Sequence, residues 1–167
     1  MGQWSLKERL QPSLLDRLTD LKPTQAKESS SQQTMSQSQF KEAVVRDLGW
    51  LLNTPALDVC VDLEKYPQVQ RSVLNYGLPD MSGHTASNVK VHIMEKAIKS
   101  AIQLFEPRII RNSLKVKIHS NPDEMSHNSL IFEIAGSVFG QPAPFHVVLK
   151  SELDLECGDF NVKESFD

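Results

Sequence analysis

The sequence predicts one α+β domain, with N-terminal helices packed on a C-terminal antiparallel three-stranded meander that has a long terminal hairpin. Three observations predict this fold class. Apolar side chains recur at helical spacing up to residue 105, apolar and polar side chains alternate from residue 114 onward, and Pro107 separates the two patterns. Because the helical segments come first and the strands last, we expect the helices to cover one face of the sheet.

Length and composition narrow the classes of protein. With 167 residues and 40% hydrophobic content, the chain can bury one core, and a second full domain would be hard to fit. The net charge of -3 gives no basic footprint for nucleic acid or an anionic membrane. No apolar run approaches the roughly 20 residues that a bilayer span requires, and the start of the chain lacks a secretory signal. We therefore expect a cytoplasmic protein.

Neither a cofactor nor a metal ion is expected from the sequence. Cys60 and Cys157 lie far apart without a C-x-x-C partner, and the five histidines show no metal-ligand spacing. The sequence also contains no glycine-rich phosphate loop and no Gly-x-Ser-x-Gly elbow. Most classes of enzyme are therefore not indicated.

The N-terminal region predicts a helical arm, residues 1–21, and a flexible linker, residues 22–38. Leucines recur at roughly helical spacing around Pro12, which predicts a short amphipathic helix over residues 13–21. An isolated helix of this length is only marginally stable in water. It should therefore dock on its own domain or on another protein. The linker is rich in Ser and Gln and has few large apolar residues to offset the entropy of ordering. Residues 39–167 form the predicted domain.

After the linker, two further helices are expected before residue 80. Ser36 and Gln39 are spaced as a capping box for the first, which ends at the Asn-Thr-Pro of residues 53–55. Its apolar face comprises Phe40, Val44, Leu48, Leu51 and Leu52. Trp50 lies off this face, either as a half-buried aromatic residue or as an interface anchor. Pro67 begins the second, shorter helix, and Gly77 stands where a glycine commonly ends one.

The central helix, residues 87–105, carries an apolar stripe along its length. The stripe comprises Met94, Ala97, Ile98, Ala101, Ile102 and Phe105. Pro107 lacks a backbone N–H and disfavours helical geometry at the residue before it, so the helix should end near Phe105 or Glu106. Glu106 and Arg108 therefore lie where the helix meets the sheet.

Three strands are expected after Arg108, at about residues 114–119, 130–135 and 145–156. The third is longer than the usual five or six residues, so it should extend past its neighbour. One set of alternate positions includes Val147, Leu149, Ser151, Leu153 and Leu155, and the charged residues Lys150, Glu152, Asp154 and Glu156 lie between them. An exposed strand edge can accept a partner's strand, and charged residues can also serve only to block such pairing.

Glu106 and Arg108 allow three interpretations. They can form a local ion pair, which stabilises little if exposed. Arg108 can instead present its guanidinium fork to a partner's carboxylate or carbonyl groups while Glu106 orients it. Glu106 can also be the acid of a glycoside hydrolase, which needs a protonated carboxyl group and a second carboxylate. Arg108 favours the ionised form of Glu106, however, and no pattern singles out a second acid.

Four motifs carry a resemblance to a known family. They are SLLDRLTD at residues 13–20, VVRDLGWLLNT at 44–54, YPQVQRSVLNYGLPDMSG at 66–83 and FEPRI at 105–109. In these motifs the sequence resembles the contractile-phage baseplate wedge proteins, often labelled tail-lysozyme-like, which include the type VI secretion subunit TssE. Pro55 departs from the pattern, since such proteins often carry an arginine after Leu-Leu-Asn-Thr.

The resemblance implies a structural role without turnover, in a baseplate recruited to the inner membrane. It implies that Glu106, Pro107 and Arg108 bind the bundle formed by TssF and TssG. It also implies that the terminal hairpin, roughly residues 131–155, accepts strands from the TssB/TssC sheath and starts its polymerisation. The residues expected to take part in this strand addition are Val147, Leu149, Ser151, Leu153 and Leu155.

Other baseplate proteins, such as TssK, are further implied partners. On this basis we expect the Glu106 and Arg108 pair to lie at an interface, and the helix of residues 13–21 to dock on another baseplate protein. The alternatives are a peptidoglycan-cleaving hydrolase that uses Glu106 and a free-standing adaptor.

Overall fold

The computed structural model describes residues 10–19, 23–24, 35–79, 91–119, 129–140, 143–154 and 156–164. The α-helices are α1 (Leu14–Leu18), α2 (Gln37–Leu52), α3 (Pro67–Gln70) and α4 (Val91–Phe105). Three short 3-10 helices are η2 (Leu57–Val59), η3 (Val73–Asn75) and η4 (Arg111–Ser113). The strands are β1 (Lys115–His119), β2 (Ser129–Val138), β3 (Phe145–Asp154) and β4 (Phe160–Glu164). The predicted α+β class is confirmed.

The sheet is an antiparallel meander of four strands in the order β1-β2-β3-β4. The prediction of three strands was wrong, because β3 ends at Asp154 and a turn leads into β4. Gly158 has a φ of 79° in this turn, a conformation that favours glycine. The five residues of β4 then pair with Leu149–Leu153 of β3. Its short length left too little alternation for the sequence pattern to identify it.

The second strand is also longer than predicted, because Gly136 does not end it. A Cβ atom at Gly136 would lie 3.1 Å from the Cγ2 atom of Ile109. The glycine therefore lets the turn after α4 approach the strand closely, and β2 continues to Val138.

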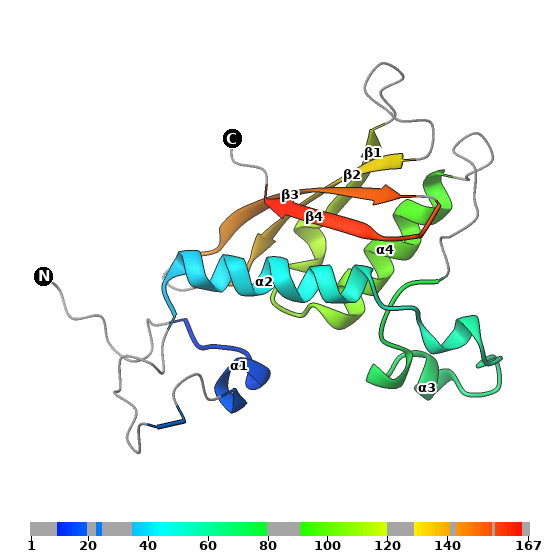
Figure 1. The fold of residues 1–167 in the computed structure, drawn as a ribbon, viewed down its shortest axis with the longest axis horizontal. Helices are drawn as coiled ribbons and strands as arrows, with labels where there is room; N and C mark the ends of the chain where they lie inside the picture. The colour runs from blue at the N-terminus through cyan, green and yellow to red at the C-terminus, as the bar shows by residue number, and fades with distance from the viewer. Residues whose placement is uncertain are drawn as a thin grey trace, which may run out of the picture.

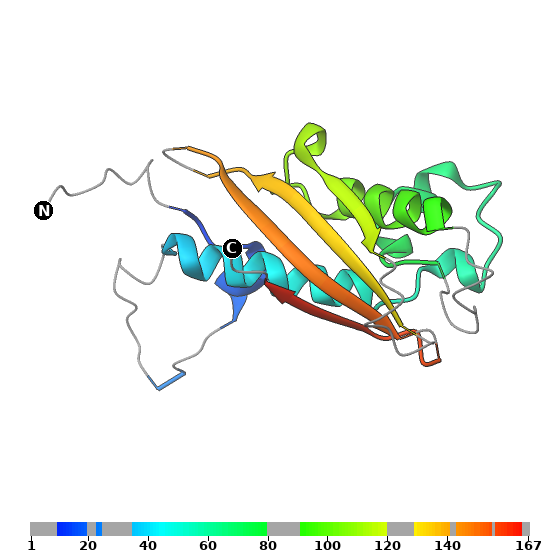
Figure 2. The same cartoon turned by 90° about the horizontal axis from the view of Figure 1, so that it is seen from above.

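The helices cover one face of the sheet, as expected. In Figure 1 the sheet lies above α2 and α4, while α1 and α3 lie below them. Viewed from above in Figure 2, the strands run diagonally across the two helices. Helix α2 packs against β4 and α4 against β1. Phe132 of β2 is fully buried between these layers, and alternate residues of β2 and β3 point into the same core.

The predicted boundaries of α2 and α4 agree with the structure where it describes them. The Ser36 side chain accepts from the backbone N–H of Gln39 (3.2 Å), and the Gln39 side chain accepts from that of Ser36 (2.9 Å). Helix α4 ends at Phe105, directly before Glu106 and Pro107. Its predicted start, residues 87–90, lies outside the described residues.

The second predicted helix is divided in two. Ser72 has an extended backbone between α3 and η3, and its side chain accepts from the N–H of Leu74. Gly77 directly follows Tyr76, the C-cap of η3, so it lies just past a helix end as predicted, although that helix is a short 3-10 helix. Gly77 has a φ of 133°, and a Cβ atom there would lie 2.2 Å from the carbonyl oxygen of Thr54. This segment lies so close because Leu78 exchanges backbone hydrogen bonds with Thr54 and Ala56.

The arm contacts its own domain, whereas most of the predicted linker lies outside the described residues. Leu10 pairs with Met35 in an isolated bridge, and Asp16 of α1 forms an ion pair with Arg46 of α2. Docking of this arm on another protein stays a prediction. Across the described part of the chain, no helix is long and apolar enough to cross a membrane.

Candidate binding site at the Glu-Pro-Arg turn

The turn that carries Glu106, Pro107 and Arg108 is fixed on both sides. The N–H of Glu106 donates to Ile102 in the last turn of α4 (2.9 Å). On the other side, the carbonyl of Arg108 accepts from the N–H of Phe139 (2.7 Å), and Ile110 donates to Ser137 (2.8 Å). The turn therefore joins α4 to the end of β2, and its two charged side chains start from a rigid backbone.

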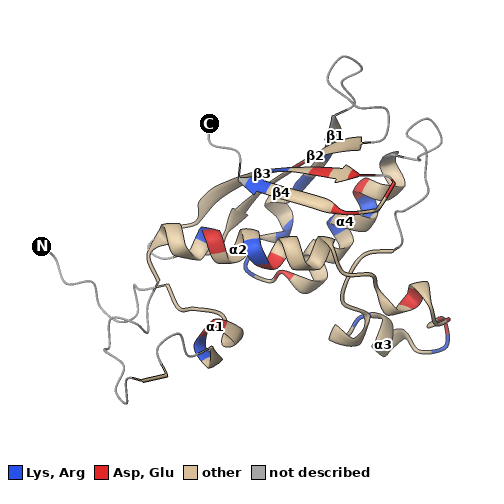
Figure 3. Cartoon of the chain, viewed as in Figure 1, with Lys and Arg blue, Asp and Glu red and all other residues tan. Residues whose placement is uncertain are grey.

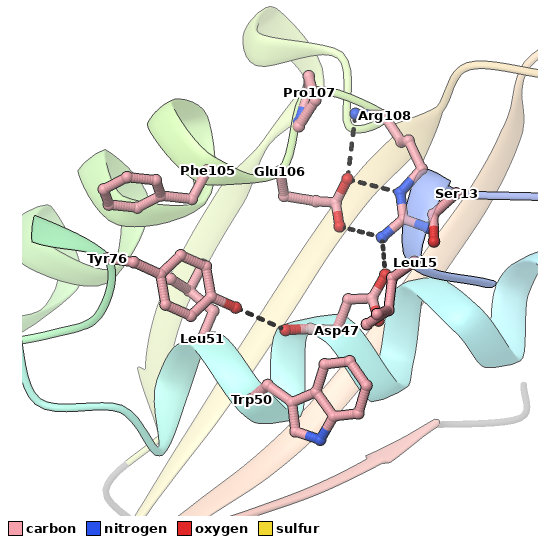
Figure 4. A pocket seen from close by; sticks show the side chains of 10 residues that line it. All are labelled: Ser13, Leu15, Asp47, Trp50, Leu51, Tyr76, Phe105, Glu106, Pro107 and Arg108. Carbon is pink, nitrogen blue, oxygen red and sulfur yellow. Dashed lines mark hydrogen bonds and ion pairs between the residues drawn. The ribbon is translucent and has the colours of Figure 1, made fainter. Parts of the chain in front are cut away.

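Glu106 and Arg108 form a bidentate pair, as Figure 4 shows. One oxygen of Glu106 accepts from the backbone N–H of Arg108 (3.1 Å) and from its Nε (2.7 Å), and the other accepts from Nη2. Glu106 is only 4% exposed. Nη2 of Arg108 also donates to Oδ2 of Asp47 in α2 (2.6 Å). The guanidinium thus joins the turn to α2.

The ionic network extends from Asp47 to α1. Oδ1 of Asp47 accepts from Nε (2.9 Å) and Nη2 (2.7 Å) of Arg46, whose Nη1 donates to Asp16 (2.7 Å). Figure 3 shows charged residues on both α1 and α2, the elements that this last pair joins. The guanidinium carbon of Arg108 lies 5.7 Å from the ring centre of Phe40, and that of Arg46 lies 4.8 Å from Trp50.

The network keeps its arginines charged. Burial alone would lower the pKa of Arg108, but the hydrogen bonds and charges of Glu106 and Asp47 outweigh it and raise the pKa. The hydrogen bond that Arg46 donates to Asp16 is the main cause of the raised pKa of Arg46, and the same bond lowers the pKa of Asp16. The site is therefore a set of mutually paired charges on three parts of the chain.

This geometry argues against a catalytic acid at Glu106. Both of its oxygens accept N–H donors from Arg108, so the carboxyl group is occupied within the chain. The neighbouring carboxylate of Asp47 binds the same guanidinium rather than facing Glu106 across an open cleft. Two nitrogens of the Arg108 fork, Nε and Nη2, already donate within the chain, whereas Nη1 is buried and has no hydrogen-bond partner.

A pocket of about 420 Å³ lies beside the network and is drawn in Figure 4. Its lining residues come from α1 and its N-cap, α2, the segment after η3, the end of α4 and the Glu-Pro-Arg turn: Ser13, Leu15, Asp47, Trp50, Leu51, Tyr76, Phe105, Glu106, Pro107 and Arg108. The Tyr76 ring packs edge-on against Phe105, and its hydroxyl donates to the Asp47 carbonyl (3.4 Å). A pocket with apolar walls next to paired charges can bind a side chain of a partner protein.

Sequence reasoning found Glu106 and Arg108 but missed Asp47, Arg46 and Asp16. One signal was present for Asp47, which lies three residues after Val44 and four before Leu51, on the apolar side of α2. A charged residue at such a position needs a partner. The identity of that partner depends on contacts between distant parts of the chain.

Three of the residues expected to accept a partner's strand, Leu149, Ser151 and Leu153, do not lie at an edge of the sheet. Val147, Leu149, Ser151 and Leu153 are buried and point toward the helices, and Leu155 lies outside the described residues. Strand β3 pairs with β2 along its whole length and with β4 across Leu149–Leu153. An open edge at Leu149–Leu153 is therefore contradicted, because β4 covers it, while Val147 lies outside this pairing.

The outer edge of β4 is partly closed by Asn53, the residue that ends α2. The N–H of Asp154 donates to the carbonyl of Asp159 at the start of the β3–β4 ladder, so these two residues form a hydrogen-bonded pair. Hydrogen-bonded and non-hydrogen-bonded pairs alternate along an antiparallel ladder. Phe160 and Val162 therefore point their backbone groups away from β3. The Asn53 amide donates to the carbonyl of Phe160 (2.9 Å) and accepts from its N–H (2.8 Å).

At the opposite edge of the sheet, an outward backbone group of β1 is also bonded by a side chain. The Glu95 side chain of α4 accepts from the N–H of Ile118 (3.0 Å), a group that points away from β2. Each sheet edge is thus bonded by one helix side chain, which limits pairing with other chains. Within the described residues, Val162 on β4 and Val116 on β1 pair with no strand on their outer sides.

The comparison with protein families identifies the class of protein. The model of the family described as baseplate wedge protein gp25 matches residues 38–143, from the first turn of α2 to just before β3 and including the Glu-Pro-Arg turn. The chain therefore belongs to this family, which also includes TssE, and is a structural protein of the baseplate wedge type. Searches of curated proteins and of solved structures found no match.

Proposed function

We propose that this protein is a non-enzymatic baseplate subunit of a type VI secretion system that joins the wedge to the sheath. It is cytoplasmic, is recruited to the baseplate at the inner membrane, and works beside other baseplate proteins such as TssK. The observation that carries the proposal is the family match over a segment that includes Glu106, Pro107 and Arg108.

The wedge contact is assigned to the Glu-Pro-Arg turn and its pocket. Because the charges of Glu106 and Arg108 pair with each other and with Asp47, their role is to fix the turn and the pocket walls. The partner, a bundle of TssF and TssG, then binds the surface that these charges hold in shape. Trp50, which is 48% exposed beside the pocket, is a suitable interface anchor.

The sheath contact is assigned to the outer edge of β4. The backbone groups of Val162 point outward there, next to the Phe160 groups that Asn53 occupies. A strand from TssB/TssC would extend the sheet at this position, with its backbone hydrogen bonds supplying affinity. The hairpin residues Leu149–Leu153 support this edge from inside the sheet.

Co-purification with TssF and TssG tests the wedge contact. We expect the wild type to elute with both subunits and Trp50→Ala to elute alone, although it folds, because an exposed aromatic anchor is lost. Val73→Ala is the matched control, since Val73 is 79% exposed but does not line the pocket. If the wild type does not elute with the wedge subunits, the proposal is wrong.

A cell-wall clearing assay tests the hydrolase alternative. Neither the wild type nor Glu106→Gln should clear peptidoglycan, because Glu106 is bound to Arg108. Clearing by the wild type that disappears in Glu106→Gln would instead establish the hydrolase.

A further inference from the structure

Basic side chains gather where α4, η4 and β1 meet. With His counted as neutral, residues 91–119 contain six basic residues and two acidic ones, a net charge of +4. The whole chain has a net charge of -3, so the remaining residues carry -7. Figure 3 shows basic residues on both α4 and β1. Apart from Arg108, the basic residues of this stretch are exposed, and together they form the basic edge: Lys96, Lys99, Arg111, Lys115 and Lys117.

Two hydrogen bonds fasten α4 along β1 and η4, which makes the basic edge one continuous surface. Near the start of α4, Oε1 of Glu95 accepts from the N–H of Ile118 in β1 (3.0 Å). Two turns later, Nε2 of Gln103 donates to the carbonyl of Arg111 in η4 (3.4 Å). Lys99 lies midway between Glu95 and Gln103, and residues four apart are neighbours on a helix surface. Lys99 therefore lies on the side of α4 that follows β1.

The lysines of β1 lie between the same two contacts. Lys115 and Lys117 follow Arg111 and precede Ile118 in the chain. They are two residues apart in one strand, so their side chains project from the same face of the sheet. The sheet ends at β1, so no further strand separates these lysines from the side on which Lys99 lies.

The basic edge lacks acidic partners within the described residues. No ion pair joins its five side chains to an acid there, whereas Arg46 and Arg108 are both paired. The nearby carboxylate of Glu95 is engaged by the backbone N–H of Ile118. Like charges held close together repel one another, so the approach of an anionic surface lowers the electrostatic free energy of this edge.

We propose that the basic edge is a docking surface for another protein whose contact surface is rich in Asp and Glu side chains. This contact is additional to the two in the proposed function. None of the five basic residues lines the pocket beside the Glu-Pro-Arg turn, and β1 lies at the opposite end of the sheet from β4. The proposal therefore holds or fails independently of the wedge and sheath contacts.

An acidic protein surface fits this edge better than a nucleic acid or an anionic membrane does. A duplex or a bilayer presents negative charge over an extended surface, so it would also approach the rest of the chain, which carries -7. A protein surface can match five cations locally and leave the acidic remainder of the chain outside the contact. The contact should weaken as salt rises, because the cations are exposed to solvent.

Binding of fluorescent poly-L-glutamate to the full chain at low ionic strength tests the proposal. Lys99→Glu combined with Lys115→Glu should weaken binding by about tenfold or more, because two cations of the edge become anions. The matched control, Lys65→Glu combined with Arg71→Glu, makes the same change in net charge at exposed positions around α3. It should bind within about threefold of the wild type, since only the long-range field changes.

A milder variant and two other polyanions complete the test. Lys96→Gln combined with Lys117→Gln, which only neutralises charge, should weaken poly-L-glutamate binding by about threefold. No binding by the wild type, or equal losses in the edge and control variants, would overturn the proposal. Tighter binding of duplex DNA or of phosphatidylglycerol vesicles would assign the edge to a nucleic acid or a membrane instead. Self-association of the wild type that the edge variants abolish would assign it to a second copy of this chain.

Discussion

Arg108 is the residue on which the site depends. Its guanidinium is the shared partner of two carboxylates, Glu106 and Asp47, that are mostly removed from water. Removal of one partner from a buried ion pair leaves charges without compensation, which costs more than the pair itself contributes. The role of Arg108 is thus first structural, and binding follows from the shape it maintains.

Arg108→Ala should therefore lower the free energy of unfolding by about 3 kcal/mol, because two carboxylates lose their cation. Urea denaturation followed by circular dichroism measures the change. Lys115→Ala, on the exposed side of β1, removes a positive charge without a buried partner and should change stability by less than about 0.5 kcal/mol. Equal effects of the two substitutions would contradict the structural role of Arg108.

Tyr76 reports on the same site through its titration. Burial, followed by the negative charges of Asp47 and Glu106, raises the pKa of Tyr76 above its ordinary value of 10.0. As the pH rises above 10, the unfolded chain loses this proton before the folded one does. The neutral phenol therefore contributes stability below pH 10 that is lost as the pH increases further.

A Tyr66→Phe variant tests this shift, since it leaves Tyr76 as the single tyrosine of the chain. The absorbance of its tyrosinate should appear with a midpoint above pH 10.0 while the protein remains folded. A midpoint at or below 10.0 would show that Tyr76 does not lie in the apolar, negatively charged surroundings described.

At the scale of elements, local rules explain what the sequence could predict. The capping box of α2 and the end of α4 before Pro107 depend on residues within one helical turn. The close pairing of Glu106 and Arg108 was foreseeable for the same reason. Contacts between distant segments could not be foreseen. Asp47 and Arg108 are 61 residues apart, and Asn53 and Phe160 are 107 residues apart. These contacts exist only after α2, the turn and β4 have packed together.

Two glycines illustrate how packing changes the meaning of a residue. Gly77 follows the end of η3 and also permits the close approach of two segments, whereas Gly49 lies in α2 with open space around it. Gly77→Ala should therefore cost about 2 kcal/mol or more in free energy of unfolding, from strain and a backbone clash. Gly49→Ala should stabilise the protein by up to about 1 kcal/mol. Thermal unfolding measures the change in Tm of each variant. Changes of the same sign in both variants would contradict this account.

At the scale of the whole molecule, the two proposed contacts lie on different parts of the fold. The wedge contact uses α1, α2 and the turn, and the sheath contact uses the outer edge of β4. The family match ends at residue 143, so β3 and β4 lie beyond it. The core that joins both contacts is made of α2, α4 and the sheet.

Deletion of residues 1–30 should leave this core folded. The deletion removes α1, which buries no residue, together with the partly exposed Asp16–Arg46 pair and the Leu10 contact. We expect the free energy of unfolding to fall by only about 1 kcal/mol, while binding to TssF–TssG weakens. Urea denaturation and the binding assay measure the two effects. Unfolding of the shortened chain would show that the arm belongs to the core.

A bridging assay tests the central claim, that one subunit joins wedge to sheath, most directly. Immobilised TssF–TssG is incubated with this protein and then with TssB/TssC. Sheath protein should be retained only when the chain is present. Val162→Pro should abolish retention, whereas Val116→Pro, which removes the equivalent outward N–H on β1, should preserve it. Retention without the chain, or equal retention with both proline variants, would contradict the account.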